Sequence, residues 1–137
     1  GVNYFCISDY HTSVDYSHRS LDMLKKIYGE DGCDRGMGTV LHNLGVSYVN
    51  LKMCKVAEKY SLQALEMRKK LYGEKSNNVK IADTLYNLAF TYNHMNRERN
   101  VIQCCKQALA IYKIVTPNNE KIQDIQGYLQ EHGVSDE

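Results

Sequence analysis

Residues 57–74 read AEKYSLQALEMRKKLYGE, and residues 13–30 read SVDYSHRSLDMLKKIYGE. The two stretches lie 44 residues apart, and nine of their eighteen positions are identical. The identical pairs are Tyr16/Tyr60, Ser17/Ser61, Leu21/Leu65, Met23/Met67, Lys25/Lys69, Lys26/Lys70, Tyr28/Tyr72, Gly29/Gly73 and Glu30/Glu74. The same offset pairs Leu41, Asn43, Leu44 and Tyr48 with Leu85, Asn87, Leu88 and Tyr92, and residues 63–65 with 107–109. One shift shared by three segments indicates an internal repeat.

The apolar residues of each unit predict two helices joined by a tight turn near residues 52–53. Large apolar residues that recur at three- and four-residue steps form one stripe on a helix. The first stripe consists of Leu41, Leu44, Tyr48 and Leu51, and the second of Ala57, Tyr60, Ala64, Met67 and Leu71.

Helix ends can also be predicted from residue type. Gly29 and Gly73 are expected to end their helices, where a left-handed residue is needed. Polar residues are expected to cap the helices that follow, because their side chains accept hydrogen bonds from free backbone amides. The expected caps are Asp31 or Asp34, Ser76 or Asn77, and Thr116 before Pro117. A last helix then runs through Ile122, Ile125 and Leu129.

Composition excludes several classes of function. The 17 basic and 16 acidic residues give a net charge of +1, which argues against nucleic acid as a partner. No apolar run approaches the roughly 20 residues of a membrane span, and no secretion signal is visible, so we expect a cytoplasmic protein. The five cysteines include no CxxC pair, which argues against disulfides, a zinc site or another cofactor. Buried packing is the favoured explanation of the adjacent Cys104 and Cys105.

The positions of the small residues resemble those of the tetratricopeptide repeat. That family places a large apolar residue before Leu-Gly or Leu-Ala, then an aromatic residue, and small residues in the second helix. One unit supplies Leu41, Leu44, Gly45, Tyr48, Ala57 and Ala64, and the next supplies Leu85, Leu88, Ala89, Tyr92 and Ala108. Small side chains are expected where helix axes approach closely.

The resemblance implies an all-α fold, an α-α superhelix of about two and a half helix-turn-helix repeats plus a C-terminal helix. We expect one domain over residues 1–137. It would consist of a partial first repeat at 1–30, a second repeat at 34–74, a third repeat at 77–116 and a capping helix at 118–132. The stretch ALEMRKKLYGE at 64–74, followed by VKIADTLYNLA at 79–89, is similar to the long repeats of kinesin light chains.

In such solenoids the first helix of each repeat lines a concave groove that binds a peptide of a partner protein. The implied groove residues of the second repeat are Thr39, His42, Asn43, Val46, Val49 and Asn50. Those of the third repeat are Asp83, Tyr86, Asn87, Phe90, Asn93 and His94, and the first repeat adds Val2, Phe5 and Cys6.

Asn43 and Asn87 recur at one groove position, although asparagine is a mediocre helix former. An amide can donate to and accept from the main chain of an extended peptide, while Val46 and Phe90 offer apolar contacts. The kinesin-light-chain resemblance implies this role for the two asparagines. The alternative is that they form hydrogen bonds between neighbouring helices.

Other functions are less well supported. The chaperone-binding branch of the family clamps a carboxylate with lysines and arginines, but the matching places hold Thr39, His42, Asp83 and Tyr86. His42 and His94 are the best candidates for acid–base catalysis, yet no carboxylate is spaced to orient either one. We therefore expect no enzyme, unless a catalytic domain lies outside this sequence.

The main alternative to peptide binding is a structural role. The repeat register begins inside the first repeat, and terminal repeats expose apolar faces. Such a face predicts self-association, as in a homodimer, or docking onto another domain of a longer chain.

Overall fold

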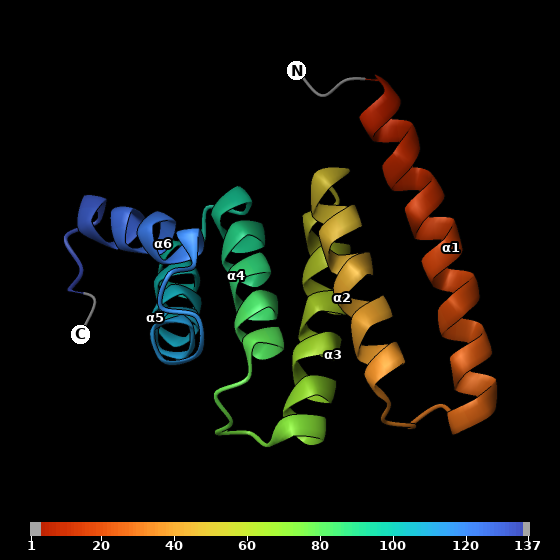
Figure 1. The fold of residues 1–137 in the computed structure, drawn as a ribbon. Coiled ribbons are helices and arrows are strands. Elements are labelled where there is room, and N and C mark those ends of the chain that lie inside the picture. Colours follow the sequence, from red (N-terminus) through yellow and green to blue (C-terminus); the bar gives the residue numbers. More distant parts are fainter. Residues whose placement is uncertain (1–3, 136–137) are drawn as a thin grey trace. The chain divides into compact units, whose positions relative to one another are not determined.

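The computed structural model describes the backbone of residues 4–135 and the side chains of residues 9–135. Within this range it has six α-helices and no strand, which confirms the all-α prediction (Figure 1). The helices are α1 (Tyr4–Tyr28), α2 (Arg35–Asn50), α3 (Cys54–Tyr72), α4 (Val79–His94), α5 (Glu98–Val115) and α6 (Glu120–Glu131). They form two compact parts, an N-terminal unit that ends at Glu74 and a C-terminal unit that begins at Lys75.

The N-terminal unit consists of α1, α2 and α3, and both α1 and α3 pack on α2 (Figure 1). Its buried core is formed by Val14, Leu21, Met37, Leu41, Leu44 and Ala64. Ala57 and Ala64 of α3 are completely buried, as is expected where two helix backbones approach closely.

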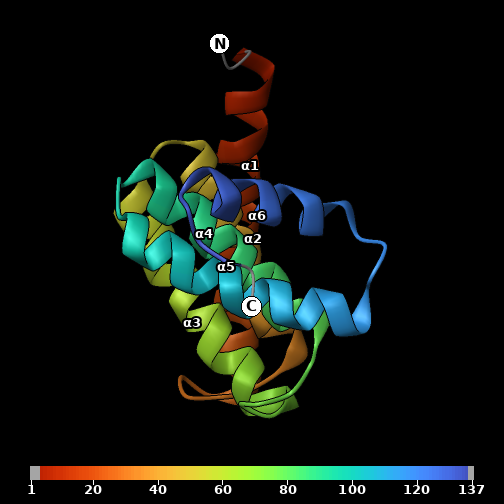
Figure 2. The same cartoon turned by 90° about the vertical axis from the view of Figure 1, so that its left-hand side faces the viewer.

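The C-terminal unit consists of α4, α5 and α6. Figure 2 shows α6 doubling back beside α5 after the turn at 116–119. The core contains large side chains of all three helices, namely Leu85, Leu88, Leu109, Tyr112, Ile125 and Leu129. The last helix is therefore part of this core.

The turn inside each helix pair has the same backbone conformation, 44 residues apart. Lys52 and Asn96 have positive φ angles of 65° and 59°. The amide of Met53 donates to the carbonyl of Tyr48 at 2.9 Å, and the amide of Arg97 donates to that of Tyr92 at 3.0 Å. The sequence repeat is thus also a repeat of turn geometry, and the predicted break near residues 52–53 is confirmed.

The predicted helix ends are partly corrected. Gly29 and Gly73 follow their helices with positive φ, as predicted. Asp34 caps α2, because its carboxylate accepts hydrogen bonds from the amides of Gly36 and Met37.

The caps of α4 and α6 differ from the predicted residues. Asn78, rather than Ser76 or Asn77, caps α4 through the amide of Lys80 at 2.8 Å. Asn119, rather than Thr116, caps α6 through the amide of Lys121 at 3.0 Å. Thr116 instead ends α5, and its hydroxyl donates to the carbonyl of Tyr112 at 3.4 Å.

The first helix is longer than the repeat register suggests. Residues 4–12 continue α1 without a break, whereas the equivalent place in the next repeat contains the turn at 51–53. Val2 lies outside the described residues, and the side chains of Phe5 and Cys6 lie outside them as well.

Candidate functional site

The predicted groove positions of α2 differ in accessibility. Thr39 and Asn43 are exposed, whereas Val49 is buried. His42, Val46 and Asn50 are half-buried. The amide nitrogen of Asn50 donates to the carbonyl of Val46 at 2.8 Å within the same helix. Asn43 is therefore the most accessible amide on this helix.

The two recurrent asparagines have different environments. Asn43 is exposed, but Asn87 on α4 is buried, with 8% of its surface accessible. Phe90, Asn93 and His94 on α4 are exposed. The accessible groove positions of α4 thus lie in its second half.

A hollow of about 160 Å³ lies among the three helices of the C-terminal unit, and we call it the α4–α6 hollow. It is lined by Tyr86, Ala89, Phe90 and Asn93 of α4, Val101 and Cys105 of α5, and Asp124, Ile125 and Tyr128 of α6. Three predicted groove residues, Tyr86, Phe90 and Asn93, thus share one concave surface. The lining residues of α6 were not predicted.

Phe90 is the accessible aromatic side chain of this hollow. It is 45% exposed, and the ring of His94 meets it edge-on with the centroids 4.7 Å apart. This edge-on arrangement is a favourable geometry for aromatic rings. Phe90 therefore presents apolar surface at the opening of the hollow.

Polar groups of α4, α5 and α6 form a network beside the hollow. Tyr112 donates its hydroxyl proton to Asp83, and the ammonium group of Lys121 lies 3.2 Å from the same carboxylate oxygen. Burial and the hydrogen bond to Asp83 raise the pKa of Tyr112, so this phenol remains a proton donor. Asp83, a predicted groove residue, is thus held by residues of α5 and α6.

Tyr86 is also held by α6. Its hydroxyl donates to the carboxylate of Asp124 at 3.4 Å, and the Lys121 ammonium lies 5.3 Å from its ring centroid. Burial and the negative charge of Asp124 raise the pKa of Tyr86. The helix predicted only to close the repeat array therefore also orients two groove residues of α4.

The cysteines among residues 9–135 form no disulfide and have different environments. Cys105, which lines the hollow, is buried, and burial raises the pKa of its thiol to about 11. A neutral buried thiol is a poor nucleophile. Cys104 is half-buried, whereas Cys33 of the N-terminal unit is exposed.

The histidines named as candidates for acid–base catalysis, His42 and His94, have different surroundings. His42 is half-buried, and His94 contacts Phe90. His18 of α1 lies 2.8 Å from the hydroxyl of Tyr48. Among residues 9–135, no three histidine, cysteine or acidic side chains are placed to hold a metal ion.

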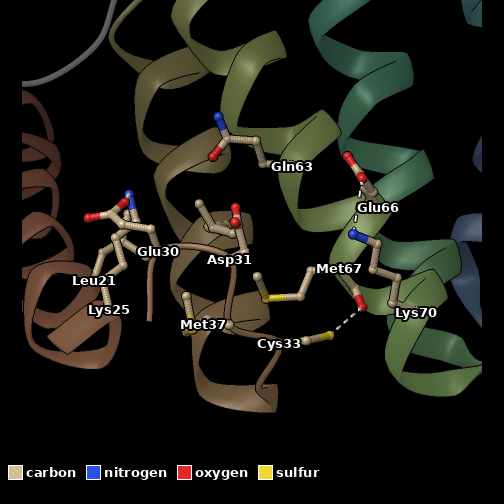
Figure 3. Close-up of a pocket in the computed structure, with 12 residues that line it drawn as sticks. Leu21, Lys25, Glu30, Asp31, Cys33, Met37, Gln63, Glu66, Met67 and Lys70 are labelled. Atoms are coloured by element: carbon tan, nitrogen blue, oxygen red, sulfur yellow. Dashed lines mark hydrogen bonds and ion pairs between the residues drawn. The ribbon is translucent and has the colours of Figure 1, made fainter. Parts of the chain in front are cut away.

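A second hollow, of about 400 Å³, lies in the N-terminal unit (Figure 3). Leu21, Met37, Leu41 and Met67 supply its apolar lining. Two ion pairs lie along it, Lys25 with Glu30 at 3.7 Å and Lys70 with Glu66 at 3.3 Å. It contains none of the predicted groove residues.

Two helix pairs with the same turn and a shared 44-residue period define a helical-repeat protein. The tetratricopeptide repeat model matches residues 36–114, which is more than half of the chain. The chain therefore belongs to the tetratricopeptide repeat family. Domains of this family generally serve as protein–protein interaction scaffolds rather than enzymes. No curated protein matches the sequence significantly.

Among the described helices, none combines the length and the apolar character needed to cross a bilayer.

Proposed function

We propose that the chain binds a peptide segment of a protein partner on the first helix of a helix pair, and that α4 of the C-terminal unit is the helix that does so. The α4–α6 hollow would receive an apolar side chain of that segment. The exposure of Phe90 at the hollow carries this proposal. Phe90 occupies a predicted groove position, lines the hollow and is 45% exposed. Concave apolar sites with a few polar groups are typical of ligand binding.

The polar groups around the hollow suggest how the segment would be oriented. Asn93 is exposed at the hollow, and its amide can pair with a peptide backbone as both donor and acceptor. Asp124 adds a negative charge, which favours a basic residue next to the apolar one. On α2, the exposed Asn43 offers a further amide of the same kind.

Two finer assignments belong to this proposal. The stretch ALEMRKKLYGE at 64–74 supports a kinesin-light-chain-like type of repeat. Cys33, Cys54, Cys104 and Cys105 are thiols that form no disulfide, which supports a reducing compartment such as the cytoplasm.

A peptide array probed with the wild-type chain and with variants tests the proposal. Phe90→Ala and Asn43→Ala should each abolish or weaken the binding of peptides that the wild-type chain binds. Ile114→Ala is the control, because Ile114 is 65% exposed and does not line the hollow. Asn87→Ala is less informative, since loss of this buried amide also affects stability. An unchanged set of bound peptides in Phe90→Ala would contradict the proposal.

A second candidate function is a structural one, in which the chain pairs with another copy of itself. Large apolar side chains exposed on α1, such as Met23 and Ile27, favour it. Light scattering over a concentration series tests this function. A constant monomer mass would count against it.

A further inference from the structure

The hollow of about 400 Å³ in the N-terminal unit, which we call the α1–α3 hollow, has an apolar part to its lining. Leu21 of α1, Met37 and Leu41 of α2 and Met67 of α3 form this part (Figure 3). Met67 is half-buried, and the other three are buried. Methionine side chains are flexible and polarisable, so they adapt to the shape of a ligand. This lining suits an aliphatic group.

The charged residues of the lining are three acidic and two basic ones, which gives a net charge of −1. Lys25 lies 3.7 Å from Glu30, and Lys70 lies 3.3 Å from Glu66. Asp31 is the remaining one, and within residues 9–135 its carboxylate takes part in no ion pair or hydrogen bond. Both lysines are thus paired, while one carboxylate is available to a ligand.

An anionic ligand is not favoured at this hollow. The N-terminal end of α2 adjoins the hollow at Met37, and helix ends of this kind bind anions. Asp34 already occupies that end, because its carboxylate accepts hydrogen bonds from the amides of Gly36 and Met37. The neighbouring Lys26 and Lys69 do not line the hollow. A cation with an aliphatic portion therefore fits the lining best.

We propose that the α1–α3 hollow binds an arginine side chain of a partner protein. The methylene groups of this arginine would lie on Met37 and Met67, and its guanidinium group would pair with Asp31. A guanidinium group matches a carboxylate through two parallel hydrogen bonds. The hollow shares no residue with the α4–α6 hollow, so this is a second binding site.

The open rim of the hollow favours an arginine that is part of a peptide chain. The side chains of Glu30, Glu66 and Lys70 are 84%, 71% and 65% exposed. A free small molecule would stay partly in water there, whereas pockets for such ligands bury most of the ligand surface. The residues next to the arginine in a peptide can add contacts with these exposed side chains.

An NMR titration of the whole isotope-labelled chain tests this site. The probe is a short glycine–serine peptide with one central arginine, and the control peptide has citrulline, which keeps the shape but lacks the charge. We expect backbone amide shifts to change in residues 30–33 and 63–70. Citrulline in the peptide, or Asp31→Asn in the chain, should raise the Kd about fivefold or more. Asp22→Asn should bind like the wild type, because Asp22 is exposed and does not line the hollow.

Cys33 gives an independent readout of occupancy. Its thiol is exposed and lines the hollow, so the bound arginine peptide should slow its alkylation by iodoacetamide. Cys54 is half-buried and does not line the hollow, which makes it the internal reference in mass spectrometry. An unchanged alkylation rate of Cys33 under saturating peptide would contradict the proposed site.

The other outcomes are separable. An absence of shift changes at millimolar peptide would overturn the proposal, as would equal binding of the citrulline peptide or equal binding by Asp31→Asn and Asp22→Asn. Tighter binding of agmatine, a free amine with the same guanidinium group, would also overturn it, because a small molecule would then be the occupant. Circular dichroism should show equal helix content in Asp31→Asn, since Asp31 is exposed in the turn after α1. Phe90→Ala should bind the probe like the wild type, which separates this site from the α4–α6 hollow.

Discussion

The rings of Tyr48 in α2 and Tyr60 in α3 stack with their centroids 5.6 Å apart and their planes 7° apart. The hydroxyl of Tyr48 also lies 2.8 Å from Nε2 of His18 in α1. Burial and the nearby Tyr60 raise the pKa of Tyr48. One tyrosine therefore links all three helices of the N-terminal unit.

A double-mutant cycle on this pair measures the link. Tyr48→Ala and Tyr60→Ala should each lower the free energy of unfolding by about 2 kcal/mol, since both rings are partly buried. The loss of unfolding free energy in the double variant should be about 0.5–1.5 kcal/mol smaller than the sum of the two single losses. The reason is that each single variant already removes the stacking contact. Urea unfolding provides the values. Strictly additive losses would mean that the stacking itself adds nothing.

Two glycines should respond in opposite ways to replacement by alanine. Gly127 lies within α6 with no atom near the place of an added Cβ, so Gly127→Ala should stabilise the chain by about 0.5–1 kcal/mol. Gly29 has a φ of 90°, so Gly29→Ala should destabilise it by about 1 kcal/mol. Melting temperatures that shift in the same direction would contradict this assignment.

The hydroxyl of Tyr112 should contribute to stability through Asp83. Tyr112→Phe leaves the Asp83 carboxylate with Lys121 alone, and it should cost about 1–2 kcal/mol of unfolding free energy. Tyr86→Phe is the matched control, because its hydrogen bond to Asp124 is longer, at 3.4 Å, and exposed. Chemical unfolding should give a lower free energy of unfolding for Tyr112→Phe than for Tyr86→Phe. The reverse order would show that the network does not stabilise the unit.

Cys105 should make stability fall at alkaline pH. Its pKa is about 11 in the folded chain against an ordinary 9.0, so folding favours the neutral thiol. This contribution is fully present below pH 9 and is lost as the pH rises toward 11, by about 2 kcal/mol in all. Urea midpoints measured between pH 8 and 11 should fall more steeply in the wild type than in Cys105→Ala. Parallel curves would contradict the effect.

The fold could be predicted largely from the 44-residue period. Two copies of each pattern show which features are shared, so the helix pairs and the turn near 52–53 followed directly. The cap of α4 was missed although the period indicates it, because Asn78 lies 44 residues after Asp34. Local residue type alone had favoured its neighbours Ser76 and Asn77.

The site was less predictable. Asp124 and Tyr128 line the hollow, but their counterparts 44 residues earlier, Lys80 and Thr84, have different chemistry, so the period gave no signal there. Asn43 and Asn87 are identical in sequence but differ in burial. Burial depends on tertiary neighbours, which local sequence does not contain.

Binding of a partner's peptide at the α4–α6 hollow can be tested residue by residue. The most direct measurement is the change in backbone amide NMR shifts when a peptide selected on the wild-type array is titrated into the isotope-labelled chain. We expect the largest changes in residues 86–93 and 121–128, and we expect Phe90→Ala to raise the Kd about fivefold or more. Equal affinity in Phe90→Ala, with shift changes confined to helices outside the C-terminal unit, would contradict it.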